Sequence, residues 1–361
     1  MKKLLIFLLK LAFAAGILTW LIIRADIKSE NFTDVPAYCL AGAAVCLMIQ
    51  IALTSIRWYA LLRCIGIRLP FREVFSLAMQ GVFFTLFIPA GSVGGDLIKA
   101  GILAKRAEGG QKFNGVFSIF MDRLCGLLGL VSFTLLSCLL FFPVIRTFSA
   151  GLRFGVYMVM LACASVYAAA AAVFFYDFLY RTKGLGKLLA LMDRYSKGAF
   201  SHAAEAVASY RKKWRVLLGW VLATTFVFFP FLTASLWFLG YGVCGERLKL
   251  PVCILASNLS QTIAAVPLTN GGIGTRDYAA QRILEAGGIP LHEASLIPLL
   301  YTAVFLLVSL SGAFFFIFDS FIRGKNACIS AEKDYNKAGS SSGMTTEQTQ
   351  ESSIEHKSGR E

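Results

Sequence analysis

Six apolar runs, each long enough to cross a membrane as a helix, constrain this chain more than any other feature. The hydrocarbon core of a bilayer requires about 20 consecutive apolar residues in helical form. Hydrophobic residues make up 57% of the 361 residues and charged residues only 16%, against roughly 45–50% and about 25% in soluble domains. The sequence therefore predicts an all-α polytopic membrane protein rather than a soluble enzyme. The six runs lie near residues 4–23, 36–56, 115–142, 154–176, 215–241 and 294–320.

The first run has two interpretations. Lys2 and Lys3 give it a basic start, and Ala-Phe-Ala at 12–14 resembles a signal-peptide cleavage site. The apolar run continues to Ile23, however, which is too long for an ordinary signal peptide. We therefore expect an uncleaved membrane anchor.

Positive charge predicts which connections between spans face the cytoplasm. The connection 181–215 holds nine Lys and Arg residues and only two acids. The connections 57–72 and 99–112 hold four Lys or Arg residues each. Two Lys or Arg residues are present in each of the connections 24–35, 143–153 and 242–252. The three basic connections should therefore lie inside.

Two further apolar runs, 74–88 and 250–268, are shorter or end in proline and glycine. If 74–88 crossed the membrane, the connections 99–112 and 181–215 would both lie outside, against the charge rule. If it enters and returns on one face, all the basic connections and both termini lie inside. The same reasoning makes 250–268 enter from the outer face. The sequence thus predicts about six full transmembrane helices plus two re-entrant, glycine-broken helical segments, and it suggests an inverted repeat.

Each re-entrant segment ends in a proline, a cluster of glycines, an acid and a base. Proline removes a helix donor and glycine permits left-handed backbone, so both helices are expected to break. Broken backbone at membrane depth is tolerated only where protein buries it or where it lines a watery cavity. The helix-break residues are Pro89, Gly91, Gly94 and Gly95 in the first segment and Pro267, Asn270, Gly271, Gly272 and Gly274 in the second.

Two broken helices that enter from opposite faces are typical of transporters with a midplane binding site. The helix N-termini after the breaks can point free N–H groups at an anion. Close helix packing through small residues is the alternative explanation of the glycines, but it does not explain the charges beside them. Those charges are Asp96 and Lys99 in the first segment and Arg276 and Asp277 in the second. We interpret them as residues that bind or translocate a lipid headgroup.

Asp122 and Arg123 add two charges near the cytoplasmic start of a predicted span. A charge inside the membrane costs at least about 2.5–3.5 kcal/mol, so it is a functional candidate. Adjacent residues point about 100° apart on a helix, so each needs its own partner. We expect Arg123 to face Asp96, and Asp122 to face Lys99 or Arg57. The alternative is an interfacial pair that snorkels to water.

Other chemistry is sparse in this sequence. The nine cysteines form no CxxC pair and the three histidines are far apart, so no metal or cofactor site is expected. GxxxxGK[ST] and GxGxxG motifs are absent. Trp58 lies near a predicted span end, where aromatic side chains often anchor a helix at the membrane interface.

The motifs also resemble those of a known family. The matching residues of the first half are Arg57, Trp58, Gly66, Pro89, Gly94, Gly95, Asp96, Lys99, Asp122, Arg123 and Gly126. Those of the second half are Asn258, Gln261, Pro267 and the run Gly271-Gly272-Ile273-Gly274-Thr275-Arg276-Asp277. The family is the lysylphosphatidylglycerol synthase transmembrane-region, or flippase-like, integral membrane proteins. The resemblance runs from about residue 5 to 322.

This resemblance implies an inner-membrane protein related to the part of multiple-peptide-resistance factors that moves aminoacylated phosphatidylglycerol between leaflets. Lys99 stands where the family usually has Arg, and Asp277 where it usually has Glu; both keep the charge but change reach and hydrogen-bond geometry. The sequence contains no soluble aminoacyl-transferase domain, so its lipid need not be aminoacylated. Other members of the family stand beside glycosyltransferases that use polyprenyl-phosphate sugars.

We therefore predict a flippase-like transmembrane domain over 1–322 and a disordered cytoplasmic tail over 323–361, because the tail is too polar to fold alone. The predicted function is a translocase, not an enzyme, in the plasma (inner) membrane. Its substrate would be an anionic or aminoacylated phospholipid or a polyprenyl-phosphate-linked lipid. The alternatives are a non-catalytic partner of an envelope glycosyltransferase and an intramembrane lipid-processing enzyme. The expected partners are membrane lipids and, in the former case, that glycosyltransferase; nucleic acid is not expected.

Overall fold

The computed structural model describes residues 35–87, 94–106, 111–174, 213–266, 269 and 272–318. Regular secondary structure in these residues is helical throughout, which confirms the all-α fold class. Five helices are long and apolar enough to cross a membrane: Ala37–Cys64, Gly115–Leu140, Ala150–Ala170, Trp214–Arg247 and Leu291–Phe318. They coincide with the second to sixth predicted spans. The first predicted span, near 4–23, and the predicted tail, 323–361, lie outside the described residues.

The described elements follow one another in a simple order. They are α3 (Ala37–Cys64), α4 (Phe71–Phe87), α5 (Gly94–Arg106), α6 (Gln111–Leu140), α7 (Phe142–Arg146), α8 (Ala150–Phe174), α12 (Trp214–Ala223), the π-helical turn η2 (Thr224–Phe228), α13 (Phe229–Cys244), the 3-10 turn η3 (Gly245–Arg247), α14 (Leu250–Ala264), α15 (Thr275–Ala286) and the last helix (Leu291–Phe318). The chain divides into two units, Met1–Gly312 and Ala313–Glu361. The contacts discussed below all lie within the first unit.

Proline and glycine set several helix boundaries. Pro143 and Pro251 each lie in the first turn of a helix, where the missing N–H has no intrahelical partner to lose. Gly66 follows α3 with a φ of 83°, a left-handed conformation that ends helices. The sequence thus places the ends of these apolar helices by local chemistry.

The helices α14 and α15 form an antiparallel pair, called here the second hairpin. At its base, a Cβ on Gly287 would overlap the side chain of Val252. At its tip, a Cβ on Gly272 would lie 2.5 Å from the Cβ of Ala264. Gly272 and Gly274 have φ values of 75° and 84°, so the chain reverses through backbone that favours glycine. The predicted helix break is therefore confirmed at these two residues.

The helices α4 and α5 form the first hairpin. A Cβ on Gly95 would overlap the carbonyl oxygen of Gly81, so the two helices meet backbone to backbone. Close packing, the alternative explanation of the glycines, therefore accounts for Gly95. Gly94 is the first residue of α5. The remaining helix-break residues, Pro89, Gly91, Pro267, Asn270 and Gly271, lie outside the described residues.

The contact at Gly95 yields a stability prediction. We expect Gly95→Ala to destabilise the protein by about 1–3 kcal/mol, because the added methyl group forces α4 and α5 apart. Gly101→Ala in the same helix is the matched control, because no atom lies within 4 Å of its Cβ position. There alanine should stabilise the helix by up to about 1 kcal/mol. Thermal unfolding in detergent measures both, and equal stability of the two variants would contradict the prediction.

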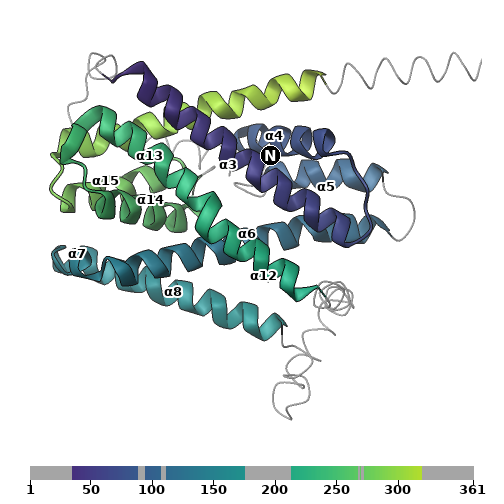
Figure 1. Ribbon diagram of the computed structural model, residues 1–361, viewed down its shortest axis with the longest axis horizontal. Helices are drawn as coiled ribbons and strands as arrows, with labels where there is room; N and C mark the ends of the chain where they lie inside the picture. Colours follow the sequence, from purple (N-terminus) through teal and green to yellow (C-terminus); the bar gives the residue numbers. More distant parts are fainter. Residues whose placement is uncertain are drawn as a thin grey trace, which may run out of the picture. The chain divides into compact units, whose positions relative to one another are not determined.

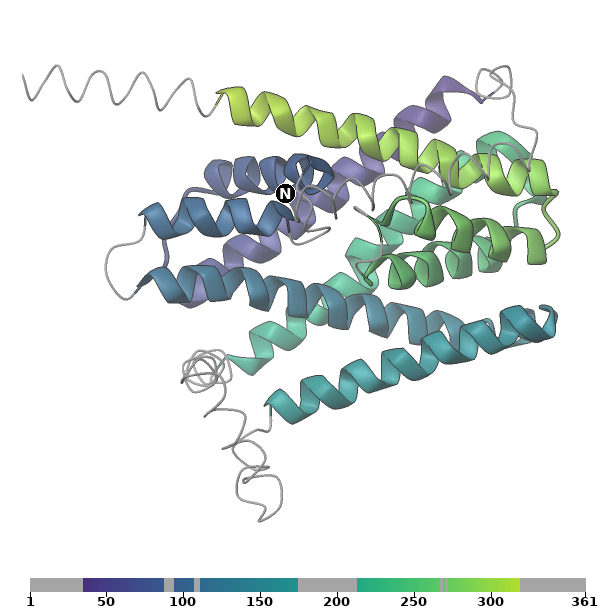
Figure 2. The same ribbon diagram turned by 180° about the vertical axis from the view of Figure 1, so that it is seen from behind.

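The order span, hairpin, span occurs twice along the chain. The first set is α3, the first hairpin and α6; the second is α12–α13, the second hairpin and the last helix. The helices α3 and α13 run antiparallel, because Cys39 lies beside Gly242 while Gly42 lies beside Phe238. The two hairpins lie at opposite ends of this bundle, and their tips point toward its middle (Figure 1). Figure 2 shows the same arrangement from behind.

The described ends of the connections that the charge rule placed together lie close to one another in the structure. The Nζ of Lys213 donates a hydrogen bond of 2.8 Å to the carbonyl oxygen of Cys64, which joins the end of 181–215 to the end of α3. A Cβ on Gly115 would contact Ile67 and Leu103 at the same end. This agrees with the predicted grouping of the basic connections. The orientation relative to the cell remains a prediction.

Candidate functional site

The first group of charged residues centres on Asp96, in the first turn of α5. Its carboxylate is 2.5 Å from the Nε of Arg123 on α6 and 3.4 Å from the Nζ of Lys99. The Lys99 ammonium also lies 5.2 Å from the centre of the Trp58 ring, within cation–π range. Asp96 is 8% exposed, whereas the side chain of Arg123 is 52% exposed. One buried acid therefore holds two cations, one of which reaches the surface.

A second ion pair lies beside it and is almost completely buried. The Nε of Arg57 on α3 donates a hydrogen bond of 2.7 Å to Asp122 on α6. Its Nη1 donates one of 2.9 Å to the hydroxyl of Thr224 in the π-helical turn η2. The absence of a side chain at Gly126 makes room for the guanidinium, whose Nη2 would lie 3.1 Å from a Cβ there. This pair joins three spans, and we call the three ion pairs around Asp96 and Asp122 together the first cluster.

The second cluster lies where α15 begins, at the tip of the second hairpin. The hydroxyl of Thr302 on the last helix donates a hydrogen bond of 2.8 Å to Oδ1 of Asp277. The Nη2 of Arg276 lies 2.5 Å from that hydroxyl and 3.3 Å from the same carboxylate oxygen. The backbone N–H of Gly274 donates a bond of 2.9 Å to Oδ2 of Asp277. Asp277 is thus fully buried, with both oxygens hydrogen-bonded inside the protein.

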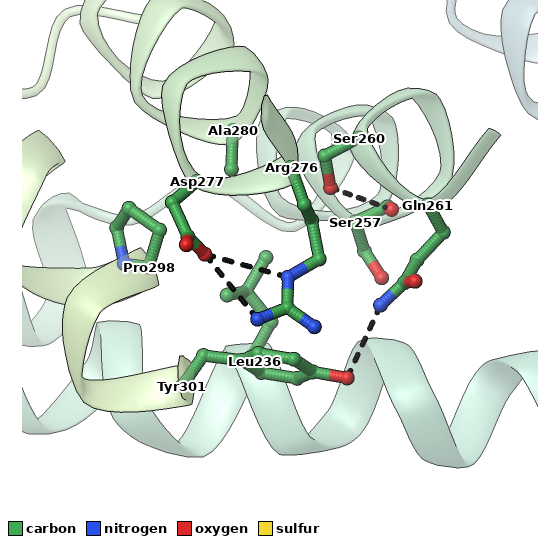
Figure 3. A pocket seen from close by; sticks show the side chains of 9 residues that line it. All are labelled: Leu236, Ser257, Ser260, Gln261, Arg276, Asp277, Ala280, Pro298 and Tyr301. Atoms are coloured by element: carbon green, nitrogen blue, oxygen red, sulfur yellow. Dashed lines mark hydrogen bonds and ion pairs between the residues drawn. The ribbon is translucent and has the colours of Figure 1, made fainter. Parts of the chain in front are cut away.

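Aromatic rings of the last helix hold the Arg276 guanidinium. Its Cζ lies 4.5 Å from the ring centre of Tyr301 and 5.6 Å from that of Phe305. Gln261 of α14 donates a hydrogen bond of 3.1 Å to the Tyr301 hydroxyl. Figure 3 shows the guanidinium above the Tyr301 ring, between Asp277 and Gln261. The two aromatic rings thus hold the Arg276 guanidinium in place, and they add no negative charge to it.

A small pocket adjoins the second cluster, and Figure 3 shows its lining side chains. It has room for about one water molecule. A phosphate group could therefore reach Arg276 only if the surrounding side chains or helices moved. The lining residues are Leu236, Ser257, Ser260, Gln261, Arg276, Asp277, Ala280, Pro298 and Tyr301.

The structure brings the predicted site residues together in two groups. The expected contact of Arg123 with Asp96 is present, and Asp122 pairs with Arg57 rather than with Lys99. The interfacial alternative is wrong for Asp122, which is 7% exposed. The role of these residues in headgroup binding stays a prediction.

The sequence did not predict several contacts within the two clusters. Trp58 was expected at a membrane interface, but it is 2% exposed, contacts Lys99 and donates a hydrogen bond to Ser118. Thr224 and Thr302 are hydroxyl residues within apolar spans, and nothing in the sequence distinguishes them from their neighbours Thr225 and Tyr301. Their contacts become visible only when the helices are packed together.

The region of the chain that matches a known family contains both clusters. The sequence matches the family described as lysylphosphatidylglycerol synthase TM region over residues 7–312. The chain belongs to this family. The resemblance inferred from the motifs is thereby confirmed, and with it an integral membrane protein of this family. A search of curated proteins found no match.

Proposed function

We propose that this protein is a translocase for a lipid whose headgroup contains a phosphate. The candidate substrates are an anionic or aminoacylated phospholipid and a polyprenyl-phosphate-linked lipid. The observation that carries the proposal is the pair of hairpins at opposite ends of one bundle, each with an acid and a base where its second helix begins. Membership of the family supports a lipid-related role.

Helix lengths support a re-entrant placement of both hairpins. At 1.5 Å per residue, the 17 residues of α4 extend about 26 Å and the 15 residues of α14 about 22 Å. Both are shorter than the hydrocarbon core of about 30 Å, yet longer than half of it. Each hairpin would therefore enter from its own face and end inside the hydrocarbon core, so that the ends of the two hairpins overlap across the midplane. Transporters with broken helices bind their substrates in such a position.

The clusters supply the chemistry that a phosphate requires. Arg276 can hold two phosphate oxygens with its planar guanidinium, and Lys99 can act as a point charge. Arg123 is the cation with the larger exposed fraction, so we propose that a lipid phosphate meets the first cluster before the second. The acyl chains would remain in the surrounding lipid.

The test is translocation by the purified full-length protein in vesicles. Three substrates are compared: fluorescent phosphatidylglycerol, lysyl-phosphatidylglycerol and a polyprenyl-phosphate sugar. The proposal expects at least one of them to change leaflets faster than in protein-free vesicles. Chemical conversion of a lipid would instead support the intramembrane enzyme. Failure of all three, together with co-purification of a glycosyltransferase, would support the non-catalytic partner.

A further inference from the structure

In the second cluster, the chain's own carboxylate stands where a bound anion would be expected. Asp277 accepts hydrogen bonds from a helix N-terminus, at Gly274, and from the hydroxyl of Thr302 while it pairs with the Arg276 guanidinium. A helix N-terminus and an arginine are the groups that bind phosphate in many proteins. Asp277 therefore occupies this site in the structure, where it also completes the capping box of α15.

A lipid phosphate that takes the edge of the Arg276 guanidinium formed by Nε and Nη2 displaces the Asp277 carboxylate, which now lies against these two atoms. Among the described residues that line the pocket, the charged ones are Arg276 and Asp277 themselves. The packed elements otherwise present uncharged groups: Leu236 of α13, Ser257, Ser260 and Gln261 of α14, and Pro298, Tyr301 and Thr302 of the last helix. A displaced Asp277 would be a buried charge without a counterion, which costs several kcal/mol. Taking up a proton removes that charge.

We propose that the protein moves one proton together with each phosphate-bearing anionic lipid. This rests on the proposed translocase function. Asp277 gains a proton when the lipid phosphate takes its place on Arg276, and it loses that proton when the lipid leaves. An O–H bond of hydronium breaks as the O–H bond of Asp277 forms, and the proton returns to water when the lipid leaves. With a singly charged phosphodiester, the loaded site holds one positive and one negative charge, as the empty site does.

The pocket offers a route for this proton. It touches Asp277, is lined by the hydroxyl-bearing Ser257 and Ser260, and has room for about one water molecule. The hydroxyl of Thr233 donates a hydrogen bond of 3.2 Å to that of Ser257, which extends the polar path to α13. A water molecule in the pocket could pass a proton along these groups to Asp277.

The first cluster differs in a way that assigns the proton to Asp277. Asp96 pairs with both Arg123 and Lys99, so it keeps one cation when a phosphate takes the other. Asp277 pairs with Arg276 alone among the residues that surround it in the described structure. Protonation therefore has the larger effect at the second hairpin.

The experiment uses full-length protein in phosphatidylcholine vesicles that contain fluorescent phosphatidylglycerol. A difference of one pH unit is imposed while valinomycin and potassium hold the membrane potential at zero. Co-movement of one proton predicts about a tenfold excess of label in the leaflet that faces the higher pH, because one pH unit equals about 1.4 kcal/mol. Label in protein-free vesicles is subtracted. A change of membrane potential at equal pH should leave the distribution unchanged.

The variant Asp277→Asn should lose the response of the label distribution to pH, whatever its translocation rate. Arg282→Ala, at a partly exposed ion pair on the same helix, should respond like the wild type. Because Asp277→Asn could misfold, the leaflet distribution of label with the wild-type protein tests proton coupling without the variant. Translocation with equal label at every pH difference would overturn proton coupling and leave the translocase intact. An absence of phosphatidylglycerol translocation would overturn proton coupling, and it would overturn the translocase as well only if lysyl-phosphatidylglycerol and the polyprenyl-phosphate sugar also failed to move.

Discussion

Replacing Arg276 by alanine is expected to slow lipid translocation about 10- to 100-fold. A hydrogen bond to a charged group contributes about 1.5–3 kcal/mol, and each 1.4 kcal/mol is a factor of ten. Arg276→Lys should restore part of the rate, because the ammonium keeps the charge but loses the planar pair of donors. Asp277→Ala should reduce the rate less than Arg276→Ala, because the acid orients the cation and does not itself hold phosphate.

The readout is lipid movement per molecule of correctly folded and inserted protein, since Arg276→Ala leaves Asp277 buried without its cation. Arg282→Ala is the matched control, because its side chain on the same helix is 36% exposed and pairs with Glu285. It should retain the wild-type rate. Full activity of Arg276→Ala at wild-type abundance would remove the anion-binding role and favour the non-catalytic partner.

The second large effect concerns the buried pair of Arg57 and Asp122. We expect Asp122→Ala to lower the free energy of unfolding by about 3–5 kcal/mol, because it leaves a buried guanidinium without its counterion. The loss of stability should involve more than one helix, because Arg57 also binds Thr224 and so connects α3 to the π-helical turn. Thermal unfolding in detergent, followed by tryptophan fluorescence, measures it.

A double variant separates the lost pair from a general loss of packing. Arg57→Met combined with Asp122→Ala should be more stable than Asp122→Ala alone, because no unpaired charge remains. Arg247→Ala is the control at an exposed pair, where the side chain is 59% exposed, and it should cost less than about 1 kcal/mol. If Asp122→Ala costs no more than this control, the pair is dispensable for stability.

The helices and the breaks between them were predictable from the sequence. Apolar runs of about 20 residues give a strong signal, because the bilayer leaves the backbone no other partner than its own helix. The break at Gly272 and Gly274 was predictable as well, since few other residues adopt their left-handed φ. At Gly95 the same residue type has another cause, the close approach of Gly81, and sequence could not choose between the two.

The sequence by itself thus determined which segments are helices, where they break and which charges need partners. Only the tertiary structure showed which residues pair with these charges. Asp122 had two candidate cations, and the packing of α3 on α6 selected Arg57. Thr302 joined Arg276 and Asp277 because the last helix lies against the tip of the second hairpin. A single hydroxyl in an apolar span has no pattern in sequence, because its role depends on residues that are distant along the chain and meet it only when the helices pack.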